Sequence, residues 1–189
     1  SATLSDGSAL PSWLTFDATT QIFSGIPGNS DVGSLSLVVT ATDTWGLSAS
    51  SAFNLSVANV NDAPVATMQV ADQLVAQGTP WNMPLPAGMF TDQDFIYGDS
   101  LTYSALLADG TALPVWLTCD AATGMLSGTA GVGDTGVLLV RIVATDTTGL
   151  SATGTFNLTV ANMVTGTLYN DTINGTAGLD YIQAGIGND

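Results

Sequence analysis

Apolar and polar residues alternate over two long stretches of the chain, and the whole pattern occurs twice. Within residues 35–41 every second side chain is apolar, and residues 138–144 repeat this arrangement. A second alternating run follows each of them, at residues 53–57 and 156–160, after a short turn that contains aspartate and glycine. A period of two places one row of side chains on a buried sheet face. Each pair of runs therefore predicts a β-hairpin.

Shorter apolar runs lie between these hairpins. Residues 13–16 and 22–24 have the composition of short strands, and so do residues 65–70, 81–85 and 101–105. Clusters of Gly, Asn, Asp and Thr separate them, which is typical of turns. No segment has the period of an amphipathic helix, so the sequence predicts an all-β chain of antiparallel β-sandwiches.

The two halves of the chain are copies of one module. Residues 8–59 align without a gap to residues 111–162, and 29 of the 52 aligned positions are identical. A repeat of this length is large enough for each copy to hold its own core. The first copy lacks the opening strands of the second. We therefore expect a truncated module at residues 1–61 and a complete one at residues 62–163.

The charge composition excludes several classes of function. The net charge is −15, all 16 acidic residues are aspartate, Arg141 is the only Lys or Arg, and histidine is absent. Such a chain cannot neutralise phosphates, which excludes nucleic acid as a partner. Without His, Lys or Glu, hydrolytic triads, histidine zinc sites and Schiff bases are unavailable, so we predict no enzyme activity. No apolar run approaches the length of a membrane span.

The tail at residues 164–189 follows a different rule. Asp171, Asp180 and Asp189 are spaced nine residues apart, as are Ile173 and Ile182, and glycines occupy the turn positions. In such a unit glycine and asparagine make a tight turn, aspartate ligates calcium, and isoleucine fills a narrow core. The spacing therefore predicts a calcium-binding repeat.

This tail resembles the RTX (hemolysin-type) nonapeptide repeats of secreted bacterial proteins. That family forms a parallel β-roll with calcium between stacked turns, so the resemblance implies a partial β-roll here. The tail departs from the family pattern at Thr167 and Thr176, which take positions where the repeat has a second glycine.

Three acidic segments occur in a specific order across the modules. Residues 60–65 read Val-Asn-Asp-Ala-Pro-Val, residues 90–94 read Phe-Thr-Asp-Gln-Asp, and residues 144–146 read Ala-Thr-Asp at the end of a long strand. The order resembles that of cadherin repeats, and more closely that of bacterial dystroglycan-type cadherin-like modules with an Ig-like fold. In that family the three segments converge on one calcium cluster between domains, because calcium takes six to eight oxygen ligands.

The resemblance implies a ligand set at the junction of the two modules. Its members are Asn59 or Asn61, Asp62, Asp92, Asp94 and Asp146. The family's glutamate ligands have no equivalent in a chain without glutamate, which makes Asp31 a candidate substitute. Whether Asp43 or Asp99 joins a site stays open.

Each aspartate also has a simpler interpretation as a turn residue, because its short carboxylate accepts hydrogen bonds from nearby backbone amides. We prefer this interpretation for Asp6, Asp17, Asp109 and Asp120, which lie in ordinary turn sequences. For Asp43 and Asp146 both interpretations stand. For the pair at residues 92 and 94 and for the tail aspartates, calcium is preferred.

Together these patterns predict a calcium-rigidified extracellular spacer or adhesion segment of a large secreted or surface-attached bacterial RTX adhesin. Its partners would be calcium and other cell-surface proteins or glycans. The alternative is a carbohydrate- or peptide-binding accessory module of a secreted RTX-family enzyme.

Overall fold

The computed structural model describes residues 1–185, and the chain is built from β-strands joined by turns and two short 3₁₀ segments. It divides into two compact units, Ser1–Asn61 and Asp62–Asp189. Each unit is described by itself. Within the described residues, no helix has the length and apolar character needed to cross a membrane.

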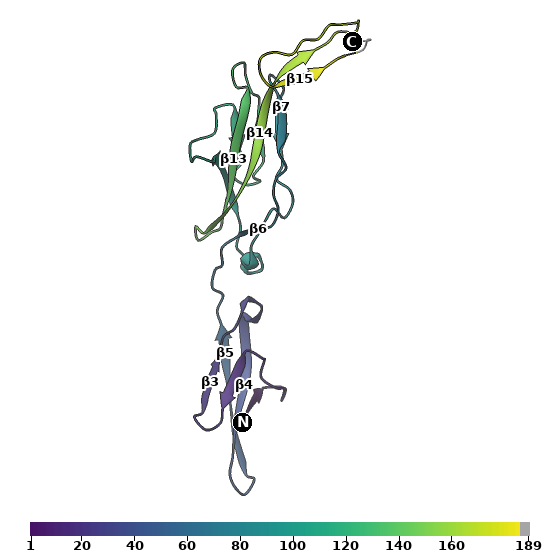
Figure 1. The fold of residues 1–189 in the computed structure, drawn as a ribbon. Helices are drawn as coiled ribbons and strands as arrows, with labels where there is room; N and C mark the ends of the chain where they lie inside the picture. Colours follow the sequence, from purple (N-terminus) through teal and green to yellow (C-terminus); the bar gives the residue numbers. More distant parts are fainter. Residues whose placement is uncertain (186–189) are drawn as a thin grey trace. The chain divides into compact units, whose positions relative to one another are not determined.

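The larger sheet of the second unit is built on the predicted hairpin. Strand β13 (Gly136–Thr145) pairs antiparallel with β14 (Ser151–Thr165) and, on its other side, with β10 (Thr102–Leu107). Strand β7 (Gln73–Ala76) adds to the free edge of β14 in a parallel orientation. Figure 1 shows β13, β14 and β7 side by side.

The smaller sheet of this unit has the order β11 (Leu117–Cys119), β12 (Leu126–Gly128) and β8 (Trp81–Met83). A further short pair joins β6 (Val65–Ala66) to β9 (Phe90–Thr91). Apolar side chains from both sheets meet in one buried cluster, as a β-sandwich requires. Its fully or nearly fully buried members include Met83, Met89, Leu117, Leu126, Val140, Ile142, Phe156 and Leu158.

The first unit repeats part of this arrangement. Strand β4 (Gly33–Thr42) pairs antiparallel with β1 (Ala2–Leu4) and with β5 (Ser48–Val57). A separate hairpin joins β2 (Leu14–Asp17) to β3 (Ile22–Gly25), and a 3₁₀ segment, η1 (Asn29–Asp31), leads into β4. The all-β fold and the two hairpins predicted from the alternating pattern are confirmed.

The tail from residue 164 belongs to the second unit. Its strand β15 (Asp180–Gln183) pairs parallel with the end of β14, and Asn162 lies opposite Asp180. The two strands are thus offset by two nine-residue units, the spacing seen in the sequence. β7 pairs with residues 158–161 of β14 and β15 pairs with residues 162–165, so the two strands join β14 one after the other along its length.

Some strand predictions were only partly right. The strand expected at residues 65–70 is confined to the two residues of β6, and that expected at residues 81–85 ends at Met83. Strand β7 was not predicted, because its sequence Gln-Leu-Val-Ala is short and has no aromatic residue. Its position is set by pairing to β14 rather than by local preference.

Candidate cation site

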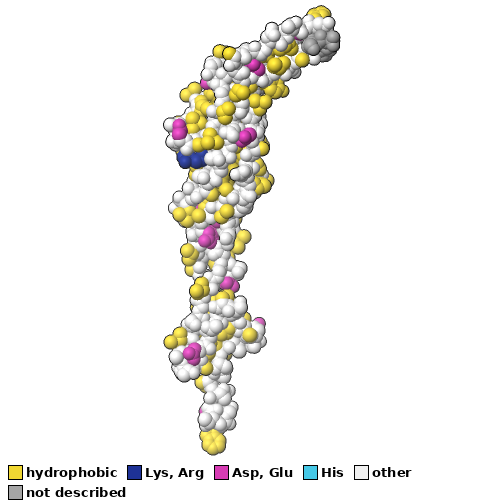
Figure 2. All heavy atoms as spheres, in the orientation of Figure 1, with side chains coloured by type: hydrophobic (Ala, Val, Ile, Leu, Met, Phe, Trp, Pro, Cys, Tyr) yellow, Lys and Arg dark blue, Asp and Glu magenta, His cyan; other side chains and the backbone are white. Residues whose placement is uncertain are grey.

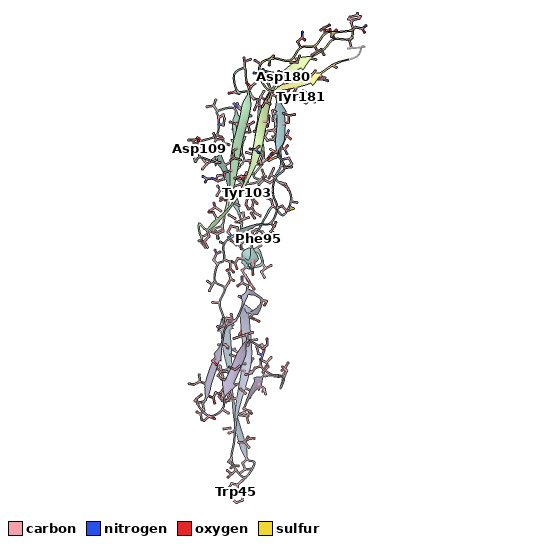
Figure 3. The ribbon with its side chains drawn as sticks, viewed as in Figure 1. Trp45, Phe95, Tyr103, Asp109, Asp180 and Tyr181 are labelled. Carbon is pink, nitrogen blue, oxygen red and sulfur yellow. The ribbon has the colours of Figure 1, made fainter. Side chains whose placement is uncertain are left out.

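A 3₁₀ segment after β9 presents the first acidic side chains. Asp92 is the N-cap of η2 (Gln93–Tyr97), and its Oδ1 accepts a hydrogen bond from the Asp94 N–H at 2.8 Å. The segment ends at Gly98, whose φ of 95° is in the left-handed region that favours glycine. This turn brings Asp99 back toward the start of the segment. Figure 3 labels Phe95 within it.

The turn between β13 and β14 presents a further carboxylate. Asp146 Oδ1 accepts hydrogen bonds from the N–H groups of Thr148 and Leu150, both at 2.8 Å. The neighbouring Thr147 ties this turn to the η2 loop, since its N–H donates to Asp99 Oδ1 at 3.1 Å and its hydroxyl donates to the same oxygen. The two segments are thus held together by side-chain hydrogen bonds.

Three carboxylates converge as a result. One oxygen from each of Asp92, Asp99 and Asp146 lies within 4.8 Å of the other two. Calcium–oxygen distances are about 2.3–2.6 Å, so two oxygens on one ion are at most about 5 Å apart. The spacing therefore suits a shared cation. Asp92 and Asp146 are 9% and 5% exposed, which removes much of the solvent that would otherwise screen their charges.

Several of these oxygens are buried without a hydrogen bond. Within residues 1–185, Asp92 Oδ2, Asp94 Oδ1 and Asp99 Oδ2 have no hydrogen-bond partner. Burying a charged oxygen without a partner is costly, and a bound cation is one arrangement that removes the cost. Asp94 is 1% exposed, and its other oxygen accepts a hydrogen bond from the Asp62 N–H at 2.6 Å.

The electrostatics keep Asp99 ionised. Its hydrogen bond from the Thr147 hydroxyl is the largest influence and lowers the pKa of the Asp99 carboxyl below its usual value, although the nearby Asp146 charge opposes this. A carboxylate that stays charged at neutral pH is a suitable ligand for a hard cation. In Figure 2 acidic side chains are scattered over the visible face, so these buried carboxylates are not part of a general acidic patch there.

The structure therefore brings together part of the predicted ligand set. Asp92 and Asp146 lie in the cluster, and Asp99, which the sequence left open, joins them. Asp62 and Asp94 are linked to it through backbone hydrogen bonds. The remaining predicted ligands, Asn59 and Asn61, belong to the first unit, and their part in a site stays a prediction.

The tail aspartates make a different set of contacts. Asp171 accepts hydrogen bonds from the Thr167 hydroxyl at 2.9 and 3.1 Å, and Asp180 accepts from the Thr176 N–H at 2.8 Å and hydroxyl at 2.6 Å. Each threonine lies four residues before its aspartate and closes a turn around it. Asp180 is labelled on β15 in Figure 3. Asp189 lies outside the described residues.

The aspartates that the sequence assigned to turns are turn residues. Asp17 Oδ1 accepts from the Thr19 N–H at 2.7 Å, and Asp6, Asp109 and Asp120 make equivalent contacts with residues two or three positions ahead. Asp43 Oδ1 accepts from the N–H groups of Trp45 and Leu47, as Asp146 does in the second unit. Asp31 Oδ2 accepts from the Gly28 N–H at 2.8 Å.

Two sandwich units built on one repeated hairpin are the arrangement of tandem Ig- and cadherin-like modules. The sequence model of the He_PIG family (Putative Ig domain) matches residues 1–58 and 63–161. The chain belongs to this family.

Solved structures support the same fold class. Human mucin-like protocadherin EC1-2 is 18% identical, with a TM-score of 0.59 over 86% of this chain and 84% of that chain. The extracellular cadherin domains 1–4 of protocadherin gamma B7 are 15% identical, with a TM-score of 0.56 over 86% of this chain and 41% of that one. At these identities the likeness shows the fold alone.

A further similar structure is an endo-fucoidan hydrolase variant of glycoside hydrolase family 107, at 24% identity and a TM-score of 0.42. The alignment covers 87% of this chain and 24% of the hydrolase, so the chain spans about a quarter of its length. No curated protein matches the chain.

Proposed function

We propose that this chain is a calcium-binding spacer segment of a larger extracellular adhesin, and that it has no catalytic role. The observation that carries the proposal is the convergence of the Asp92, Asp99 and Asp146 carboxylates within 4.8 Å, two of them largely buried. The fold supports it, since the similar protocadherin domains are extracellular by description.

The chain has almost no positive charge of its own to balance this cluster. Arg141 is its only Lys or Arg, and its net charge is −15. Compensation therefore has to come from outside the polypeptide. A set of carboxylate oxygens without imidazole or thiolate favours a hard cation, and calcium accepts the irregular geometry that loops provide, whereas magnesium requires near-ideal octahedra.

Calcium at this position would stiffen the start of the second unit. Asp62 opens that unit, and its N–H is bonded to Asp94, which in turn is bonded to Asp92 in the cluster. A cation that fixes the cluster therefore also restricts the backbone at Asp62, directly after residues 59–61. We propose millimolar affinity, in the range of extracellular calcium modules, and an RTX-type calcium role for the tail.

The test is calcium titration of the full chain, with calorimetry for binding and thermal unfolding for stability. Asp146→Asn removes one charge of the cluster while its amide oxygen can still accept the turn hydrogen bonds. Asp43→Asn is the matched control, because Asp43 makes the same backbone contacts in the first unit. We expect Asp146→Asn to weaken binding by about tenfold or more, equivalent to 1.4 kcal/mol, and Asp43→Asn to leave it unchanged.

Equal calcium responses in the two variants would contradict the site. Absence of any response of the wild-type chain to calcium and to chelator would contradict the function. Calcium-independent capture of a glycan or peptide by the second unit would favour an accessory binding module instead.

A further inference from the structure

One asparagine of the tail is followed directly by a glycine. Among the asparagines of the sequence, only Asn174 has a glycine, Gly175, as its next residue. Both residues are exposed, and they lie outside the strands, in the segment that connects β14 to β15. The tail thus places a side-chain amide next to a backbone nitrogen that no neighbouring side chain shields.

This arrangement favours a covalent reaction between the two residues. The backbone nitrogen of Gly175 can attack Cγ of Asn174 and close a five-membered ring. A side chain on the attacking residue would hinder this approach, whereas glycine has no Cβ and its backbone adopts more conformations than that of any other residue. Within residues 1–185, the structure shows no hydrogen bond that holds the Gly175 N–H or the Asn174 side chain away from this reaction.

Other asparagines are held by contacts that oppose the same reaction. Asn162 Nδ2 donates a hydrogen bond to the Thr176 hydroxyl at 2.8 Å, and Asn157 Nδ2 donates to Asp72 Oδ2 at 3.0 Å. Asn54 lies inside β5, where the hydrogen bonds to β4 fix the backbone. Asn174 is therefore the most reactive asparagine that the structure describes.

Gly175 also lies against the next aspartate of the tail. A Cβ on Gly175 would be 2.7 Å from Asp180 Oδ2. The same carboxylate accepts hydrogen bonds from the Thr176 N–H at 2.8 Å and from the Thr176 hydroxyl at 2.6 Å. The bond from this hydroxyl is the main reason that the pKa of the Asp180 carboxyl is lower than usual, so the group is ionised at neutral pH. A change of the backbone at residues 174–175 therefore acts directly on the turn that precedes β15.

We propose that Asn174 is a site of spontaneous deamidation, and that the isoaspartate formed there loosens the pairing of β15 with β14. In the first step the bond between the Gly175 nitrogen and Asn174 Cγ forms, the Cγ–Nδ2 bond breaks, and ammonia leaves with the proton of the Gly175 N–H. Water then opens the succinimide ring. Opening at Cγ gives aspartate at position 174, and opening at the backbone carbonyl gives isoaspartate. No oxidant or reductant takes part.

Isoaspartate would change both the length and the charge of this turn. Its main chain runs through Cβ and Cγ, which adds one carbon atom to the backbone between Asp171 and Asp180. The close fit of Gly175 against Asp180 depends on the unmodified spacing. The new carboxylate also repels the ionised Asp180 carboxylate. We therefore expect residues 180–183 to lose their pairing with residues 162–165.

The test is incubation of the full chain in neutral buffer with chelator, followed by peptide mass spectrometry. The peptide that contains Asn174 should gain about 1 Da earlier than any other asparagine peptide, with isoaspartate as the main product. Backbone amides of residues 180–183 should then exchange hydrogen faster in the aged chain than in the fresh chain. Because the chelator removes calcium, these readouts do not depend on the calcium response that tests the proposed function.

Three variants separate the steps. Asn174→Gln requires a larger ring for the same attack, so its mass and its hydrogen exchange should stay unchanged on incubation. Asn174→Asp adds the charge without the extra main-chain atom, and it should exchange more slowly at residues 180–183 than the aged wild-type chain. Asn170→Gln, in the preceding unit of the tail, is the matched control and should age as the wild type does. No mass gain at Asn174, an equal rate at Asn170, or unchanged exchange at residues 180–183 after conversion would each overturn the proposal.

Discussion

Replacing Asp92 by asparagine separates the two roles that this side chain has. Its Oδ1 caps η2 by accepting the Asp94 N–H, while its Oδ2 is buried without a hydrogen-bond partner within residues 1–185. Asparagine is as good an N-cap as aspartate, so Asp92→Asn keeps the first role. It removes the negative charge that the second role, binding of a cation by Oδ2, requires.

The structure gives the magnitude and sign of the stability change that Asp92→Asn causes in the absence of calcium. One oxygen of Asp92 and one of Asp146 lie within 4.8 Å, and both side chains are largely buried. At an effective dielectric constant of about 20, two such charges repel by roughly 3 kcal/mol. Part of this is screened or relaxed. We therefore expect Asp92→Asn to stabilise the second unit by about 1–2 kcal/mol in chelator.

With calcium the stability change has the opposite sign, because Asp92→Asn weakens the calcium site. A ligand at one hundred times its Kd stabilises the folded wild-type chain by about 2.7 kcal/mol. If the site of the variant is a hundredfold weaker, the same calcium concentration stabilises it by only about 0.4 kcal/mol. The calcium-induced rise in Tm should thus fall from roughly 10 °C to about 2 °C, at roughly 4 °C per kcal/mol for a unit of this size.

The assay is thermal and urea unfolding of the full chain in chelator and in calcium, with Asp92→Ala as the comparison. Asp92→Ala also loses the cap, which costs about 1 kcal/mol in both conditions. Equal destabilisation by Asp92→Asn in chelator and in calcium would refute the reasoning, because the carboxylate would then have a structural role alone.

Two further predictions concern packing and pH. Phe156→Ala should destabilise the second unit by about 3–5 kcal/mol, because Phe156 is 2% exposed. Phe53→Ala should destabilise the first unit by less than half of that, because Phe53 is 42% exposed. Equal losses of stability in urea unfolding would contradict this prediction. The lowered pKa of Asp99 gives stability that is present above the pKa of the unfolded chain and is lost as pH falls toward the folded value. Thr147→Val removes the hydroxyl that lowers this pKa, so acid unfolding followed by circular dichroism should begin at a higher pH, and an unchanged midpoint would show that the hydrogen bond is not formed.

The local sequence pattern was enough to predict the hairpins and two of the segments that form the candidate cation site. The alternation in residues 138–144 follows from one buried sheet face, and the turn that ends it places Asp146 without reference to the rest of the chain. The D-x-D sequence at residues 92–94 likewise indicates a loop with inward carboxylates. These features depend on contacts between residues close in sequence.

Asp99 shows where local pattern fails. It follows a glycine and precedes a serine, which is an ordinary turn context in the sequence. Its place in the cluster depends on the left-handed turn at Gly98 and on Thr147, which is 48 residues away. A contact of that separation leaves no periodic signal. The sequence therefore left the role of Asp99 open.

The duplicated turns have the same sequence but different surroundings in the two units. Both read Ala-Thr-Asp-Thr, and both aspartates accept the same two backbone hydrogen bonds. In the second unit the loop that follows the D-x-D sequence reaches the turn, through the contact of Thr147 with Asp99. The turn therefore supplies a single carboxylate, and the loop supplies the convergence that a cation needs. It follows that grafting charge onto the first-unit turn alone should not create a calcium site there, since it adds a ligand without bringing a second segment within reach.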